Sequence, residues 1–173
     1  MLVVGGAVKA QETESLEDVN VENEFLNKNR LGVCVGYAWI PSGSDINNQS
    51  TMHIVPSFGV KYTRRFSEKI GLAWTNEVEF ANYMIEYEGH GELEREFAFV
   101  SAVLFSYEPI PKLGLLAGPG VELERNQNFF VLKVGVEYEV KLLDDRFIST
   151  EAYYDIKEVY GALGLGLSVG AKF

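Results

Sequence analysis

Glutamates at alternating positions are the residues of this sequence whose spacing most clearly suggests chemistry. Glu77 and Glu79 form one such pair, and Glu122 and Glu124 form another. Side chains two residues apart lie on the same face of a β-strand, so each pair would present two carboxylates in one direction. Carboxylates that converge from two strands bind divalent cations, or give an opening a negative potential that attracts cations. The simpler interpretation is a solvated polar rim.

A second set of residues combines both signs of charge. Glu137 and Glu139 alternate in the same way, and Lys61 and Lys172 lie on the equivalent face of other segments. A buried charge costs several kcal/mol unless an opposite charge pairs with it. We therefore predict that Lys61 and Lys172 neutralise Glu137 and Glu139 as a structural plug.

A third set would suit nucleophilic catalysis. His53 and Ser57 share one face of a predicted strand, and Glu79 could orient the imidazole if the neighbouring strands align. The single cysteine, Cys34, and the two histidines form no cluster with metal-ligand spacing. The sequence thus predicts no cofactor and no metal site, and an enzyme only as an alternative.

The elements that carry these residues show a period of two from about residue 31 to the end, which is the pattern of β-strands. Two of the eight predicted segments, the fourth and the seventh, do not show which side faces inward. The eight segments are residues 31–40, 52–62, 70–80, 97–107, 113–124, 130–140, 146–154 and 163–173.

The two faces of these segments differ in kind. One face carries valine, leucine and aromatic residues, and the other alternates glycine with glutamate or lysine. Most segments reach the roughly 9–11 residues that a tilted strand needs to cross a bilayer, and their number is even. The pattern predicts an all-β fold, an eight-stranded antiparallel up-and-down transmembrane barrel with short periplasmic turns and longer outer loops at residues 41–51 and 84–96.

A soluble, lipocalin-like ligand carrier is the alternative fold, since it also has about eight strands. Such a carrier would place charged side chains on its outer face and large side chains in its interior. Glycine beside glutamate fits instead the narrow interior of a small barrel, where large charged groups need small neighbours. The apolar face is also larger than a water-exposed sheet tolerates.

Overall charge and the N-terminus set further limits. The net charge of -10 excludes a nucleic-acid partner, because binding a polyanion requires a basic face. Residues 1–10 are typical of the end of a secretory signal peptide, with Val8 and Ala10 before a cleavage site. Residues 11–29 are interpreted as a polar periplasmic lead-in, and residues 30–173 as the barrel.

The final segment, YGALGLGLSVGAKF at residues 160–173, resembles the C-terminal assembly signal of outer-membrane barrels through Leu165, Leu167, Val169 and the terminal aromatic Phe173. Residues 31–173 as a whole are similar to the small barrels of the outer-membrane protein A and X type. This resemblance implies a monomer in the bacterial outer membrane, with membrane lipids and the barrel-assembly machinery as partners.

The resemblance favours a non-enzymatic role in envelope structure or surface interaction. The alternatives are a narrow cation-preferring pore and a lipid A-modifying enzyme of the deacylase kind. The His-x-Ser motif of those enzymes is missing here, because Ile54 and Val55 follow His53.

Overall fold

The structure, a computed structural model, describes residues 28–44, 50–87 and 91–173. Among these residues, no helix is long and apolar enough to cross a membrane. The predicted signal peptide and most of the predicted lead-in lie outside the described residues. The described strands are β1 (Asn29–Ser44), β2 (Ser50–Arg65), β3 (Ile70–Glu79), β4 (Asn82–Tyr87), β5 (Gly91–Glu96), β6 (Phe99–Ile110), β7 (Leu113–Leu123), β8 (Phe129–Lys141), β9 (Arg146–Lys157) and β10 (Gly161–Lys172).

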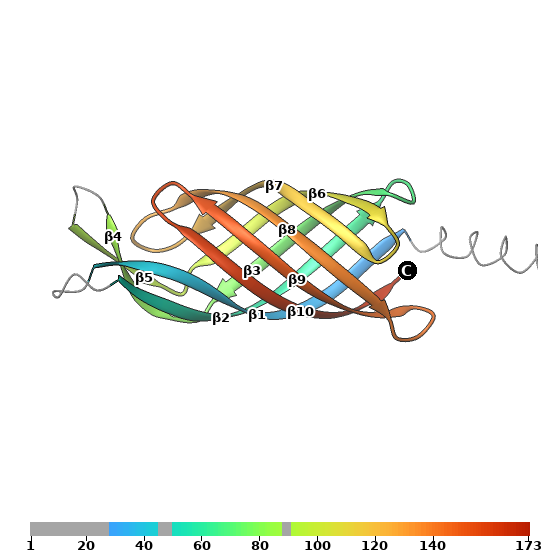
Figure 1. The fold of residues 1–173 in the computed structure, drawn as a ribbon, viewed down its shortest axis with the longest axis horizontal. Helices are drawn as coiled ribbons and strands as arrows, with labels where there is room; N and C mark the ends of the chain where they lie inside the picture. Colours follow the sequence, from blue (N-terminus) through green and yellow to red (C-terminus); the bar gives the residue numbers. More distant parts are fainter. Residues whose placement is uncertain (1–27, 45–49, 88–90) are drawn as a thin grey trace, which may run out of the picture.

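Eight of these strands form one closed antiparallel barrel (Figure 1). The order around the barrel is β1-β10-β9-β8-β7-β6-β3-β2. The first and last strands close the ring in continuous register, from Arg30 opposite Lys172 to Trp39 opposite Leu163. The structure therefore confirms the predicted eight-stranded barrel.

The two ends of the barrel differ. The turn end carries the short β2–β3, β6–β7 and β8–β9 connections, together with the start of β1 and the C-terminus (Figure 1). The opposite end, called the loop end below, carries the remaining connections. At the turn end, Lys112 adopts a φ of 73° in the tight β6–β7 turn, a backbone conformation that glycine usually occupies.

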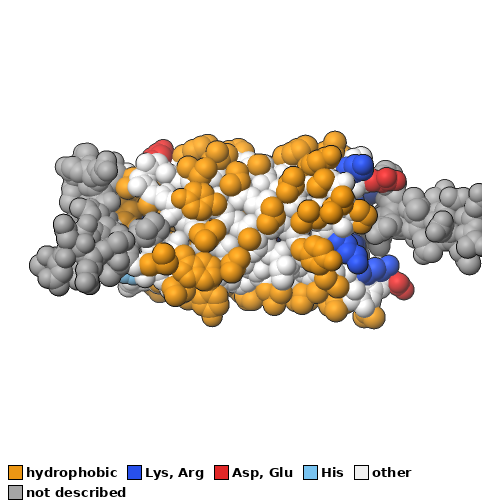
Figure 2. Space-filling model, in the orientation of Figure 1, with side chains coloured by type: hydrophobic (Ala, Val, Ile, Leu, Met, Phe, Trp, Pro, Cys, Tyr) orange, Lys and Arg blue, Asp and Glu red, His pale blue; other side chains and the backbone are white. Residues whose placement is uncertain are grey.

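The outer face of the barrel is apolar along its length (Figure 2). Strand β8 shows the alternation most simply, because Phe130 and Val136 are 53% and 45% exposed whereas Val131 and Lys133 are fully buried. Charge lies inside and hydrocarbon side chains lie outside, as predicted. The lipocalin alternative is wrong, since it requires the opposite arrangement.

A small polar group on this outer face satisfies its own hydrogen bonds. The indole Nε1 of Trp74 donates to Ser101 Oγ at 3.1 Å, and Ser101 Oγ donates to Asn76 Oδ1 at 2.9 Å. Lipid offers no hydrogen-bond partners, so such pairing lets polar side chains remain on the apolar face.

The structure settles the two segments whose faces the sequence left open. Strand β6 turns Ala102 and Leu104 inward, where they pack with Ala73 of β3 and Leu116 of β7. Both faces of β6 are apolar because this part of the interior is itself a small hydrophobic cluster. Strand β9 turns its odd-numbered residues inward, from Phe147 to Lys157.

Three loop-end predictions need correction. The segment 84–96 was predicted to be an outer loop, but its described residues, 84–87 and 91–96, belong to a second, two-stranded sheet in which β4 pairs with β5. Strands β1 and β2 continue into the predicted loop at residues 41–51, because their pairing extends to Ser44 opposite Ser50. Strand β9 continues through Lys157, three residues beyond the predicted segment 146–154.

The apolar exterior leads to a stability prediction. Replacing Val136 with arginine is expected to destabilise the folded barrel in lipid vesicles by about 2–4 kcal/mol, because this lipid-facing residue lies near the middle of β8. The same change at Val140, near the end of the strand, is expected to cost only about 0–1 kcal/mol. Urea titration in vesicles measures both values. Equal small losses at the two positions would contradict a lipid-facing β8.

Candidate functional site: the charged interior

Charged side chains fill the barrel in four layers along its axis. In each layer at least one cation lies between two carboxylates. From the turn end to the loop end, the layers are Arg30, Arg65, Glu108, Glu139 and Lys172; then Lys61, Glu137, Ser149 and Glu151; then Glu77, Lys133, Tyr153 and Asp155; then Glu79, Arg95, Glu122, Glu124, Lys157 and Tyr160.

The first layer closes around Arg30 of β1. Its guanidinium lies 3.2 Å from Glu108 and 2.8 Å from Glu139. Lys172 Nζ lies 2.6 Å from the second oxygen of Glu139, and Arg65 lies 3.0 Å from Glu108. The predicted neighbours Lys172 and Glu139 are thus in contact, and Arg30 joins them.

The second layer centres on Lys61 of β2. Its Nζ lies 2.9 Å from Glu137 and 2.6 Å from Glu151. Ser149 Oγ donates a hydrogen bond of 2.7 Å to Glu137. The structure therefore brings Lys61 and Glu137 together, and it adds Glu151, which the sequence analysis missed because the phase of β9 was ambiguous.

The third layer lies near the middle of the barrel. Lys133 Nζ is 3.3 Å from Glu77 and 3.3 Å from Asp155, and it lies 3.6 Å from the ring centroid of Tyr153. The Tyr153 hydroxyl donates to Glu77 at 3.3 Å. The Lys133 side chain is 0% exposed, so these neighbours replace all of its water.

A glycine provides the space for Tyr153. A Cβ atom built on Gly164 of β10 would lie 2.1 Å from Tyr153 Cζ, so the ring packs directly against the glycine backbone. Replacing Gly164 with alanine is expected to destabilise the barrel by about 1–3 kcal/mol, because the ring must move away from both Lys133 and Glu77.

Thermal unfolding followed by circular dichroism measures this cost. Gly166→Ala is the matched control on the same strand, where the nearest atom to the added Cβ lies 3.8 Å away. Equal losses for the two variants would show that packing of Tyr153 on Gly164 is unimportant.

The fourth layer joins the barrel wall to the hairpin. Lys157 of β9 contacts Glu122 and lies 3.4 Å from Glu79. It also donates to the Tyr160 hydroxyl at 3.0 Å, and that hydroxyl donates to Glu122 at 2.9 Å. Glu122 is fully buried within this group.

Arg95 of β5 reaches the fourth layer from the loop end and completes it. Its guanidinium contacts Glu122, lies 3.1 Å from Glu124 and donates to the Gln127 carbonyl at 2.5 Å. The guanidinium also lies 4.6 Å from the ring centroid of Phe129. The sequence analysis missed Arg95, because its partners are about thirty residues away and residues 84–96 were predicted to be an outer loop.

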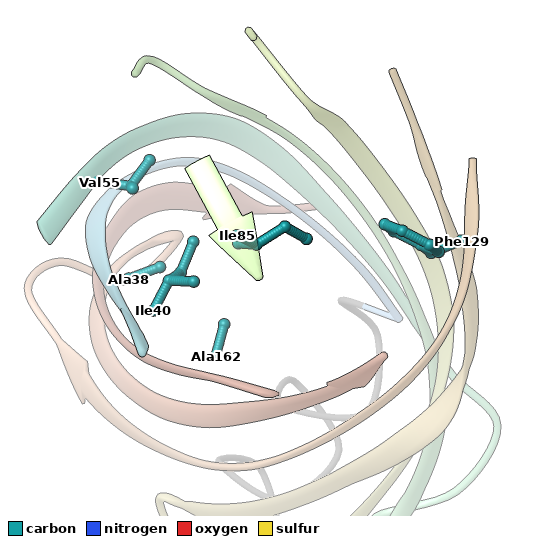
Figure 3. Close-up of a cluster of buried hydrophobic side chains, with 6 residues drawn as sticks. All are labelled: Ala38, Ile40, Val55, Ile85, Phe129 and Ala162. Carbon is teal, nitrogen blue, oxygen red and sulfur yellow. The ribbon is translucent and has the colours of Figure 1, made fainter. Parts of the chain in front are cut away.

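An apolar layer covers this ionic layer (Figure 3). Ile85 of β4 lies inside the ring of strands, in one cluster with side chains of β1, β2, β8 and β10, and it is buried. Its cluster contains Ala38, Ile40, Val55, Phe129 and Ala162. The β4–β5 hairpin therefore acts as a cap that inserts Ile85 and Arg95 into the loop end, and we call it the cap.

The cap covers the glutamates that were predicted to form an acidic mouth. Glu79, Glu122 and Glu124 do lie together at the loop end, and Glu77 lies one layer deeper. They form neither an open mouth nor a solvated rim, because the cap covers them and Arg95, Lys133 and Lys157 contact them. Among the described residues, no group of three or more acidic, histidine or cysteine side chains could hold a metal ion.

The residues considered for catalysis are separated along the sheet. Ser57 lies opposite Glu79 in the β2–β3 register. His53 is four residues from Ser57 along β2, about 13 Å at the usual rise of a strand, which exceeds the reach of a nucleophile–base hydrogen bond. Glu79 lies against Lys157.

The predicted assembly signal lies on the lipid face of the last strand. Leu165, Leu167, Val169 and Phe173 are all exposed, and β10 pairs with β1 to close the barrel. Recognition of these residues by the assembly machinery stays a prediction.

A closed eight-stranded barrel with an apolar exterior and a paired ionic interior defines the class of transmembrane β-barrel proteins. No family model matches the sequence, and no curated protein matches it by sequence. Solved structures do share the fold.

The N-terminal β-barrel domain of Pseudomonas aeruginosa OprF has a TM-score of 0.58 at 11% identity, over 84% of this chain and 98% of that one. The Yersinia pestis attachment invasion locus protein Ail, in complex with the heparin analogue sucrose octasulfate, has a TM-score of 0.53 at 14% identity, over 84% and 99%. The P. aeruginosa outer membrane protein OprG has a TM-score of 0.53 at 13% identity, over 85% and 97%. The fold is thus that of the small outer-membrane barrels, which confirms the resemblance found in the sequence.

Proposed function

We propose that this chain is a closed, non-enzymatic integral protein of the bacterial outer membrane with a structural or surface-interaction role in the envelope. The observation that carries the proposal is the occupied loop end, where Ile85 and Arg95 of the cap close a lumen already filled by ion pairs. A lumen without a continuous water path does not conduct. The cap then becomes the part of the protein that faces the cell exterior.

The closure of the barrel favours a monomer. All eight barrel strands are paired on both sides, so no strand edge remains for pairing with a second copy. Surface interaction would then involve the cap and the connections at the loop end.

A planar-bilayer recording of the purified protein tests the closed lumen. We expect no unitary current steps. A narrow cation-preferring pore is the second candidate, because the described interior layers hold nine carboxylates and seven cationic side chains. Steady cation-selective steps that change in Glu77→Gln or Glu122→Gln would replace the closed barrel with that pore.

Mass spectrometry of lipid A tests the alternative of a lipid-modifying enzyme. Mass spectra of lipid A from cells that express the protein are expected to match those from cells with an empty vector and from cells with His53→Ala. A loss or gain of one acyl chain that depends on His53 would instead establish a lipid-modifying enzyme.

A further inference from the structure

The turn end of the barrel opens into a basic cavity, the vestibule. It has a volume of about 480 Å³ and adjoins the layer formed by Arg30, Glu108 and Glu139. This size falls within the range of ligand sites, which run from about 300 to 1,000 Å³. The residues that line the vestibule belong to the turn end, where the first described residues enter β1. Figure 1 shows this end of the barrel.

The charge of the vestibule is unbalanced. Its lining has seven cationic and four acidic side chains. Three of the acids, Glu108, Glu137 and Glu139, already contact cations of the first two layers. The rim is formed by lysines from four separate places in the chain, which are Lys28 before β1, Lys69 and Lys112 in two turns, and Lys141 at the end of β8. Basic side chains also gather at this end in the surface view (Figure 2).

The segment that precedes β1 has the complementary charge. Residues 11–27 contain six acidic side chains and no lysine or arginine. The acids are Glu12, Glu14, Glu17, Asp18, Glu22 and Glu24. The segment joins the rim covalently, because Lys28 lines the vestibule and residue 27 precedes it.

The length of the tether suits binding within one molecule. An extended chain spans at most about 3.3–3.6 Å per residue, so Glu24 and Glu22 lie within about 14 and 22 Å of Lys28. A short tether gives an effective concentration in the millimolar range. Weak ion pairs with the rim lysines then suffice for substantial occupancy.

We propose that the vestibule binds carboxylates of the chain's own acidic segment, residues 11–27. The inference goes beyond the proposed function, since it assigns a binding site at the periplasmic end. Phosphates of membrane lipids are a less suitable ligand, because they surround the barrel wall whereas the vestibule opens along the axis.

Paramagnetic relaxation tests the proposal on the full chain in zwitterionic micelles. A nitroxide is attached at Asn20→Cys in a Cys34→Ser background, and amide broadening is measured at Lys112 and Gly114, with Asn126 at the loop end as the internal reference. The comparison variant carries the same label, with the six acids replaced by glutamine or asparagine. We expect broadening at Lys112 and Gly114 to fall by about threefold or more in the neutral variant and at high salt.

The rim is tested separately. Lys69→Gln with Lys112→Gln is expected to reduce the broadening at Gly114. Arg146→Gln, which neutralises an exposed cation outside the vestibule lining, is expected to leave it unchanged. Equal broadening in the acidic and neutral segments would overturn the proposal. Loss of the broadening when phosphatidylglycerol is added would overturn it in favour of a lipid phosphate. Neither result depends on whether the barrel conducts ions.

Discussion

Replacing Lys133 with methionine is expected to lower the free energy of unfolding by about 3–5 kcal/mol, because it leaves a buried charge pair without its partner. Lys133 is fully buried and lies between Glu77 and Asp155. Methionine keeps the length of the side chain, so the loss reports the missing charge more than a missing volume. Urea unfolding in micelles, followed by the fluorescence of Trp39 and Trp74, measures the change.

Two further variants separate charge from packing. Lys141→Met removes an exposed lysine at the turn end and is expected to cost about 0.5 kcal/mol or less. Adding Glu77→Gln and Asp155→Asn to Lys133→Met is expected to restore part of the lost stability, since no unpaired charge then remains. If Lys133→Met, Lys141→Met and the triple variant all unfold at the same urea concentration, the interior ion pairs contribute little to stability.

Replacing Arg95 with methionine is expected to release the cap. The guanidinium is the cap's charged contact with Glu122 and Glu124, and its loss leaves these buried carboxylates with fewer cations. The expected loss is again about 3–5 kcal/mol, concentrated in local opening of β4 and β5. Hydrogen exchange of the Ile85 and Leu93 amides is therefore expected to accelerate far more than exchange of the Val134 amide in the barrel wall.

Arg125→Met is the matched control for this change, because Arg125 is an exposed arginine at the same end of the barrel. It is expected to leave exchange unchanged. Arg95→Lys should give an intermediate result, since an ammonium cannot reproduce the forked contact of a guanidinium with two carboxylates. Uniform exchange rates in all of these proteins would mean that Ile85 alone holds the cap in place.

The sequence predicts the barrel well because its strands obey a strict period of two. Strand β8 is the simplest example, with Val131, Lys133 and Gly135 on the inner side and Leu132 and Val136 on the lipid side. The period fails where the interior is not polar. Leu104 faces inward into a small apolar cluster, so β6 carries hydrophobic residues on both faces and its phase could not be predicted.

The ionic layers could be predicted only in part. Lys61 and Glu137 lie at similar heights on strands with a clear pattern, so their proximity followed from strand direction alone. Arg95 gave no such signal. Its partners lie about thirty residues away. Its strand, GELERE, alternates glutamate with glycine, leucine and arginine and lacks the valine-leucine-aromatic face of the barrel strands. Asp155 and Lys157 were missed because β9 extends further than the predicted segment.

Most ion pairs of the interior join strands that are not neighbours in the barrel. Lys61 of β2 reaches Glu137 of β8, and Lys133 of β8 reaches Glu77 of β3. A partly assembled sheet cannot satisfy these charges, because their partners arrive only when the ring is complete. Assembly intermediates therefore carry unpaired charges that lipid solvates poorly, and this favours a single cooperative insertion step over gradual addition of hairpins.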